Sequence, residues 1–183
     1  MRAVILDRDG VINRDSDEFI KSPEEWVAIP GSLEAIARMH QAGVVVAVAT
    51  NQSGVGRALL TLETLERIHA RMLDEVRESG GAIAEIVFCP HLPDAACDCR
   101  KPAPGMLHEL ARRLDLDLAG LPVVGDSERD LVAARRAGAS PVLVRTGKGL
   151  RTLRSSRGLE GVPIFDDLAA FVDDLLAVER GPV

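Results

Sequence analysis

Apolar residues gather in short continuous runs along the chain, and segments of helical periodicity separate these runs. VVVAVAT, residues 44–50, is rich in β-branched residues and has no polar face, which is typical of a strand buried on both sides of a sheet. Similar runs predict five further strands, at residues 3–7, 85–88, 121–126, 141–144 and 163–165.

Between these runs, apolar residues recur at spacings of three and four, as one buried face of a helix requires. Residues 33–41 show this pattern and precede Gly43, so they predict a helix that stops there. Thr61 is the expected N-cap of the next helix, which Gly80 and Gly81 terminate. Three more helices are expected at residues 105–114, 127–137 and 166–178.

Strands that alternate with helices predict an α/β fold with a doubly wound, mainly parallel, Rossmann-like sheet and helices on both faces. The chain shows no repeat or linker, so we expect a single domain over residues 1–183. Crossovers fill residues 15–50 and 51–100, which leaves no room for a large cap domain and predicts an open site. That site should lie at the C-terminal ends of the strands.

Composition limits the partners that the chain is expected to bind. Its 183 residues are 46% hydrophobic, enough for a sizeable core, and the net charge of −6 disfavours nucleic acid or a membrane surface as partner. No run reaches the roughly 18 apolar residues of a membrane span, and the N-terminus meets charged residues too early for a signal peptide. We therefore expect a cytoplasmic enzyme with a small substrate. We also expect a monomer, although composition does not fix the oligomeric state.

Four of the predicted strand ends carry polar side chains that suit phosphoryl transfer. Carboxylates can hold Mg²⁺, while a lysine and a hydroxyl can bind phosphate oxygens. Each residue alone has a simpler explanation, such as a helix cap, a surface charge or a β-former, but their shared placement favours a site. The residues are Asp7, Asp9, Thr50, Lys101, Asp126 and Asp130.

The segments DRDG, Thr50, RKP and GDSERD resemble the four motifs of the haloacid dehalogenase superfamily, across residues 4–146. The resemblance implies that Asp7 is a nucleophile that forms an aspartyl phosphate, and that Asp9 acts as acid and then as base. It also implies that Mg²⁺ is held by Asp7, Asp126 and the backbone carbonyl of Asp9. Asp130 would support that metal site, and Thr50 and Lys101 would bind phosphate.

The segment CPHLPDAACDCRKP predicts a second metal site. Its four potential ligands suit tetrahedral, structural Zn²⁺ with no open position; they are Cys89, His91, Cys97 and Cys99. A lone cysteine would more simply be a small core residue, and three cysteines make a poor disulfide framework. The zinc loop, residues 89–99, would fix the position of Arg100 and Lys101, which follow it directly.

LDRDGVIN, TNQSGVGR and CDCRKP resemble a zinc-containing branch of the superfamily that acts on heptose bisphosphates or histidinol phosphate, and the heptose group matches best. The interval between His91 and Cys97 is shorter than in many of these proteins. The resemblance implies removal of the 7-phosphate of D-glycero-D-manno-heptose 1,7-bisphosphate, in ADP-heptose and lipopolysaccharide core precursor synthesis. Further candidates for binding substrate are Asn51, Ser53, Arg57 and Arg100.

Other functions stay open at this stage. A histidinol-phosphate phosphatase, or another small phosphomonoesterase, would use the same motifs, and a non-catalytic, zinc-stabilised binding module would need only the Cys/His cluster. A nucleic-acid-end phosphatase is disfavoured because 22 Lys and Arg face 28 Asp and Glu. Trp26 is expected to pack in the core rather than bind sugar. Beyond Gly147 we expect a solvated basic loop, RTLRSSRG, before the closing helix.

Overall fold

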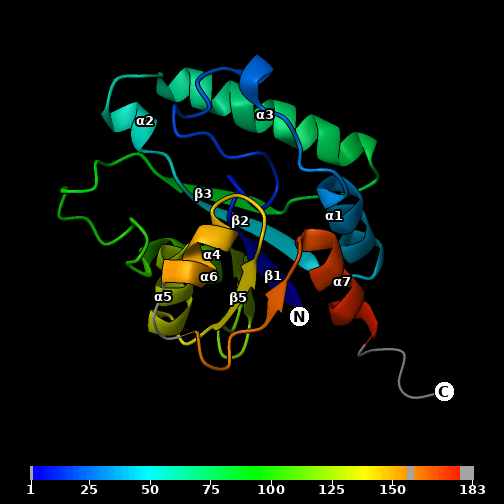
Figure 1. Cartoon of the computed structure of the whole chain (residues 1–183). Coiled ribbons are helices and arrows are strands. Elements are labelled where there is room, and N and C mark those ends of the chain that lie inside the picture. Colours follow the sequence, from blue (N-terminus) through cyan, green and yellow to red (C-terminus); the bar gives the residue numbers. More distant parts are fainter. Residues whose placement is uncertain (1, 156–158, 178–183) are drawn as a thin grey trace.

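A six-stranded parallel sheet forms the centre of the computed structural model, which describes residues 2–155 and 159–177 (Figure 1). The strand order is β3-β2-β1-β4-β5-β6, and every neighbouring pair is parallel. This order confirms the predicted doubly wound fold, since the winding reverses between β1 and β4. The strands are β1 (Ala3–Leu6), β2 (Val45–Asn51), β3 (Glu85–Cys89), β4 (Pro122–Gly125), β5 (Ser140–Val144) and β6 (Ile164–Phe165).

Helices cover both faces of the sheet, as the sequence predicts. In Figure 1, α1, α3 and α7 lie on one side of the sheet, while α4 and α5 lie on the other. The helical segments are η1 (Pro23–Glu25), α1 (Ser32–Gln41), α2 (Ser53–Gly56), α3 (Leu62–Glu78), α4 (Gly105–Leu114), α5 (Glu128–Arg136), α6 (Gly149–Ser155) and α7 (Leu168–Ala177).

The alternation along β2 explains why the strand has no polar face. Val46 and Val48 belong to the core under α1, α3 and α7, whereas Ala47 and Ala49 belong to the core under α4 and α5. Successive side chains of a strand point to opposite faces, so both sets are buried. Trp26 is fully buried in the first core, which confirms its predicted packing role.

The strand register brings the polar strand ends to one edge of the sheet. Leu6 of β1 is paired with Val48 of β2 and with Val124 of β4, so the residues that follow each strand emerge side by side. The backbone N–H of Asp7 donates to the carbonyl of Val124 at 2.9 Å and extends this pairing by one residue. Parallel pairing is therefore what gathers the candidate residues.

The prediction of a solvated basic loop beyond Gly147 is wrong over residues 149–155. These residues form α6, in which Thr152 is buried and donates to the backbone carbonyl of Asp126 at 2.8 Å. Residues 156–158 of that predicted loop, and residue 178 of the predicted closing helix, lie outside the described residues. In the described part of the chain, no helix is both long and apolar enough to cross a membrane.

Candidate active site

A polar cavity of about 260 Å³ lies at the C-terminal edge of the sheet, between the ends of β1, β2 and β4 and the loop after β3. All the residues predicted for catalysis or phosphate binding line it except Thr50. Those lining residues are Asp7, Asp9, Asn51, Ser53, Arg57, Arg100, Lys101, Asp126 and Asp130. The structure thus brings together nearly the whole predicted set.

Lys101 lies at the base of this cavity between two carboxylates. Its Nζ is 2.9 Å from Oδ1 of Asp7 and 2.6 Å from Oδ1 of Asp130, and it donates to the carbonyl of Ala49 at 2.8 Å. The Lys101 side chain is only 3% exposed. Although burial lowers the pKa of Lys101, the charges of Asp130 and Asp7 outweigh this effect and raise it. The residue is a fixed cation that points at Asp7.

Asp7 and Asp126 are neighbouring carboxyl groups whose ionised forms a bound cation would stabilise. Burial, together with the charge of Asp130, raises the pKa of Asp7 to about 7 and that of Asp126 to about 8. Ligand oxygens of Asp7, Asp126 and Asp130 lie within 4.8 Å of one another. Oδ2 of Asp126 accepts from the backbone N–H of Lys148 at 2.7 Å, which orients this carboxylate. Carboxylate oxygens gathered in this way are the ligand type that Mg²⁺ prefers, so the residues fit the predicted metal.

Two glycines make room for the Asp126 carboxylate. A Cβ at Gly10 would lie 2.0 Å from Oδ2 of Asp126, and a Cβ at Gly147 would lie 2.2 Å from the same oxygen. Both glycines have positive φ, +85° and +55°. Only a residue without a side chain leaves the carboxylate this position, which places it beside Asp7.

Asp9 is held differently from the other carboxylates. Arg8 donates to it through Nε and Nη2, Asn13 donates to Oδ1 at 2.9 Å, and Gln52 donates to Oδ2 at 2.7 Å. Burial raises the pKa of Asp9, but the charge of Arg8 and these hydrogen bonds outweigh it and lower the pKa below its usual value. Asp9 is therefore ionised at neutral pH. Its lowered pKa contrasts with the raised pKa of Asp7.

Thr50 and Asn51 are occupied by protein contacts. Thr50 is 1% exposed, and its hydroxyl accepts from Nε2 of Gln52 at 3.0 Å below the cavity. The Asn51 amide donates to the carbonyl of Lys101 at 3.0 Å and accepts from its N–H at 3.1 Å. These contacts orient both side chains at the end of β2, and the role of the two residues as phosphate ligands stays a prediction.

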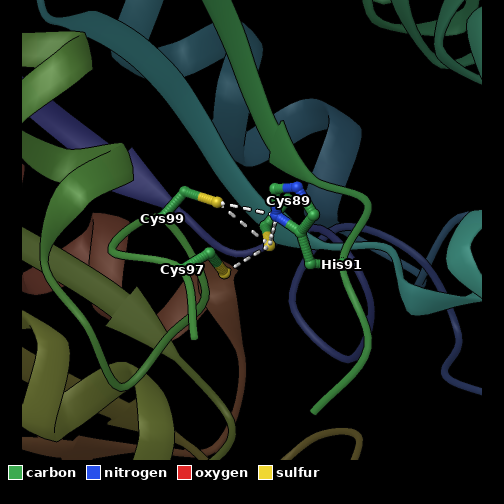
Figure 2. A group of neighbouring side chains, drawn as sticks. All are labelled: Cys89, His91, Cys97 and Cys99. Carbon is green, nitrogen blue, oxygen red and sulfur yellow. Dashed lines mark hydrogen bonds between the residues drawn. The ribbon is translucent and has the colours of Figure 1, made fainter. Parts of the chain in front are cut away.

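The four predicted zinc ligands converge at the end of β3 and in the loop that follows (Figure 2). Sγ of Cys99 lies 3.2 Å from Sγ of Cys89 and 3.2 Å from Nδ1 of His91, and the Sγ atoms of Cys89 and Cys97 are 3.8 Å apart. A tetrahedral zinc site separates such ligand atoms by about 3.5–3.8 Å, so a bound ion would require the two separations of 3.2 Å to widen slightly. The cysteines are not joined by disulfides, so the donor set fits Zn²⁺.

The thiols of this cluster differ in acidity. Burial and the neighbouring thiols raise the pKa of Cys99 to about 12. For Cys97, burial is outweighed by the backbone N–H of Arg100 and the other ligands, which lower its pKa to about 7. Zinc binds thiolates, so the cluster needs a cation to hold its charge.

Three arginines surround the outer part of the cavity: Arg57, Arg100 and Arg129. Nη1 of Arg100 donates to the carbonyl of the zinc-cluster residue His91 at 3.2 Å, and Arg57 lies above the ring of Phe19 at 5.8 Å. Burial and the charges of Arg129 and Arg57 lower the pKa of Arg100. These cations repel one another, so an anion bound between them would be stabilised.

Sequence reasoning missed several residues of the site. Arg129 was passed over inside GDSERD, and Lys148 was assigned to a solvated loop, whereas it lies in the turn after β5 and lines the cavity. Nζ of Lys148 lies 2.7 Å from Oδ2 of Asp15 at the cavity wall. Their positions after strands β4 and β5 were the available signal, since every strand end contributes to such a site. Other residues that were missed include Arg8 and Gln52, which both donate to Asp9.

The parallel sheet and the acidic cavity at its C-terminal edge agree with the comparisons to known proteins. A family model described as HAD-hydrolase-like matches residues 98–171. The structure of D,D-heptose 1,7-bisphosphate phosphatase from B. bronchiseptica, complexed with magnesium and phosphate, superposes with a TM-score of 0.95 at 53% identity, over 97% of this chain and 99% of that one. Fold and site together define a HAD-like phosphatase.

Relatives identify the family more closely. D-glycero-beta-D-manno-heptose-1,7-bisphosphate 7-phosphatase from Bordetella bronchiseptica is 54% identical over 96% of this chain and 98% of its own length. The Pseudomonas aeruginosa protein of the same name is 57% identical over 94% of this chain and 97% of its own length. The chain belongs to the D-glycero-beta-D-manno-heptose-1,7-bisphosphate 7-phosphatase family.

Proposed function

We propose that this enzyme removes the 7-phosphate of D-glycero-beta-D-manno-heptose 1,7-bisphosphate and retains the 1-phosphate. The observation that carries the proposal is the cavity itself, which has a carboxylate and cation centre at its base and arginines at its outer part. A substrate with two phosphates matches these two cationic regions. The identity of the sugar and its anomer in this proposal is taken from the names of the relatives.

Asp7 acts as the nucleophile in this proposal. One of its carboxylate oxygens bonds to phosphorus while the bond from phosphorus to the sugar oxygen breaks, which leaves an aspartyl phosphate. Water then hydrolyses that intermediate, releasing inorganic phosphate and restoring Asp7. Lys101, 2.9 Å from Asp7, neutralises charge on the transferred group. Mg²⁺ bound by Asp7, Asp126 and the Asp9 carbonyl supplies further charge neutralisation for the incoming phosphate.

Asp9 handles protons at the same centre. It is ionised in the unliganded enzyme, which is the form that takes a proton from water during hydrolysis of the intermediate. The earlier step needs a proton on the sugar oxygen. The second pKa of a phosphate monoester is about 6, so part of the substrate still has a proton on its phosphate. Asp9 is placed to take this proton and pass it to the sugar oxygen as that oxygen leaves.

A role in ADP-heptose and lipopolysaccharide core precursor synthesis follows from this substrate, and we propose that the enzyme acts there as a cytoplasmic monomer. The relatives are named as phosphatases, which argues against a non-catalytic zinc module. Zn²⁺ held by the Cys/His cluster would stabilise the loop that leads to Arg100 and Lys101.

A substrate panel tests the proposal. The enzyme with Mg²⁺ is assayed on the β and α anomers of heptose 1,7-bisphosphate, fructose 1,6-bisphosphate and histidinol phosphate. We expect the highest kcat/KM with the β-heptose bisphosphate, and phosphorus NMR of the product should show the anomeric phosphate retained. Preferred hydrolysis of histidinol phosphate would contradict the substrate, and release of the 1-phosphate would contradict the regiochemistry.

A further inference from the structure

We infer that Arg8 is a positioning residue that holds the carboxylate of Asp9 in its catalytic orientation. Arg8 lies between Asp7 and Asp9 at the end of β1, and it is 0% exposed although it is an arginine. The inference rests on the proposed function, because it takes Asp9 to be the group that moves protons in phosphoryl transfer.

The guanidinium of Arg8 donates three hydrogen bonds to the carboxylate of Asp9. Nε donates to Oδ1 at 3.2 Å, and Nη2 donates to Oδ1 at 3.0 Å and to Oδ2 at 3.1 Å. Asn13 and Gln52 add one donor to each oxygen. Rotation of the carboxylate would break several of these bonds at once. The Asp9 side chain nevertheless keeps 20% of its surface exposed, and it lines the cavity.

The surroundings of Arg8 argue that its charge serves Asp9. Leu6, Val11 and Ile12 nearby in the chain are fully buried, so an apolar side chain would suit this position. In the described part of the chain, the ion pair of Arg8 is with Asp9, and its Nη1 has no hydrogen-bond partner. Burying a guanidinium is costly, and an apolar residue of similar volume often stabilises a core as well or better.

His69 of α3 does not compete for this pair. Its ring is buried against Phe88, with ring centroids 5.8 Å apart, and burial together with the charge of Arg8 lowers its pKa to about 3. The imidazole is therefore neutral beside Arg8 and Asp9. The cation remains paired with Asp9, a carboxylate that also lines the substrate cavity, which is the arrangement a positioning residue requires.

A comparison of leaving groups separates positioning from general stability. A sugar alkoxide leaves slowly without a proton, whereas nitrophenolate leaves readily as an anion, and kcat/KM reports the steps up to formation of the aspartyl phosphate. We expect Arg8→Met to lower kcat/KM for the heptose bisphosphate about 30-fold or more and that for p-nitrophenyl phosphate less than about threefold, since acid catalysis contributes about 10²–10⁴-fold.

Two further variants complete the experiment. Arg8→Lys keeps a charge without the fork, so its selective loss should be smaller than that of Arg8→Met. Asp9→Asn should show the same selective loss, and Arg8→Met combined with Asp9→Asn should lose little more than Asp9→Asn alone, because both changes remove one function. If Arg8→Met does not fold, the selective loss in Arg8→Lys decides.

The outcomes distinguish this inference from the proposed function. Equal losses on both substrates, or losses that multiply in the double variant, would show that Arg8 is only structural. A selective loss in Asp9→Asn without one in folded Arg8 variants would overturn the inference and leave the proposed mechanism intact. If Asp9→Asn itself hydrolysed the sugar substrate normally, the proposed role of Asp9 would be wrong, and the inference would fall with it.

Discussion

Nζ of Lys101 lies 2.6 Å from Oδ1 of Asp130, and both side chains are nearly inaccessible to solvent. Oδ2 of Asp130 accepts from the backbone N–H and hydroxyl of Ser127, so the same carboxylate caps α5 and fixes Lys101. A buried pair of this kind is costly to break from one side, because the remaining charge loses its partner.

Asp130→Asn should therefore lower both stability and activity. We expect the free energy of unfolding to fall by about 3 kcal/mol, since removal of one partner of a buried pair costs about 3–5 kcal/mol. Denaturant titration measures this loss. Asp74→Asn is the matched control, because it breaks the exposed pair with Arg77 and should cost less than about 1 kcal/mol. Equal losses in the two variants would contradict the buried role of Asp130.

Asp7→Asn should abolish turnover and leave the fold intact. An amide is not a nucleophile and is a weaker metal ligand, so we expect kcat to fall by at least about 10³-fold. The neutral side chain suits the buried position, where the pKa of Asp7 is already raised to about 7. Its thermal unfolding should therefore stay within a few degrees of wild type. Near-normal turnover in this variant would rule out the aspartyl phosphate.

Much of this site could be predicted from the ends of the strands, and much of the fold could be predicted from local sequence patterns. Residues 105–114 form a helix with the predicted bounds, and Thr61 caps α3 by accepting from the N–H of Thr64. These features depend on local pattern. The helix α6 was missed because its basic residues resemble a solvated loop, and the contact that anchors it joins Thr152 to Asp126, distant in sequence.

The position of Arg8 could not be predicted for a similar reason. A charged residue after a strand is normally assigned to the surface. The burial of Arg8 depends on Asn13 and Gln52, which donate to Asp9, and on His69 of α3, which lies close enough to interact with both Arg8 and Asp9. Likewise, the two hydrogen bonds between the Asn51 amide and the backbone of Lys101 could not be predicted, because they form only when the loop after β3 returns to the end of β2.

The Cys/His cluster should carry one zinc ion per chain. Metal analysis of protein purified without chelators measures this directly. Removal of the ion with a strong chelator should lower both the unfolding temperature and the activity, because metal bound only to the folded form adds to its stability. Activity depends on the cluster through Arg100, whose guanidinium donates to the carbonyl of His91.

Two controls follow for the zinc site. Added Mg²⁺ should not restore the chelated protein, since it prefers oxygen ligands, whereas Zn²⁺ should restore it. Cys97→Ser should lower the zinc content and should also lower the unfolding temperature, as chelation does. Purified protein that contains no zinc and is unaffected by chelation would contradict the assignment.

The metal-free enzyme should lose stability as the pH rises through neutrality. The pKa values of Asp7 and Asp126 rise from about 3.8 to about 7 and about 8 in the folded state, so the folded protein binds more protons than the unfolded chain between these values. Their stabilising contribution is complete below about pH 3.8 and is lost as the pH passes about 7 to 8. Asp9 and Asp130 have lowered pKa values, so their opposite contribution changes only in acid.

Thermal unfolding in a chelator selective for Mg²⁺ over Zn²⁺, between pH 5.5 and 8.5, measures this dependence. Asp126→Asn removes one of the two groups and should flatten the curve. Mg²⁺ should raise the unfolding temperature more at pH 8 than at pH 6, because binding requires ionised carboxylates. A stabilisation by Mg²⁺ that is the same at both values would argue against these residues as its ligands.

Arg100 should contribute more to a bisphosphate than to a monophosphate. Its guanidinium lies at the outer part of the cavity near Arg57 and Arg129, while Lys101 next to it faces Asp7 at the base. A guanidinium matches two phosphate oxygens at once, and a hydrogen bond to a charged group contributes about 1.5–3 kcal/mol. Arg100→Ala should therefore lower kcat/KM for heptose 1,7-bisphosphate about 10- to 100-fold, and that for heptose 7-phosphate only a few-fold.

The comparison between the two substrates is what gives this test its meaning. Loss of the contact between Arg100 and the carbonyl of His91 would loosen the zinc loop and reduce both activities equally, because Lys101 follows the same loop. A remote contact to the 1-phosphate instead affects only the substrate that has this phosphate. Arg67→Ala, on the exposed surface of α3, is the control and should change neither value. Equal losses in Arg100→Ala would assign the second phosphate to other cations of the cavity, with Arg129 and Lys148 the next to substitute.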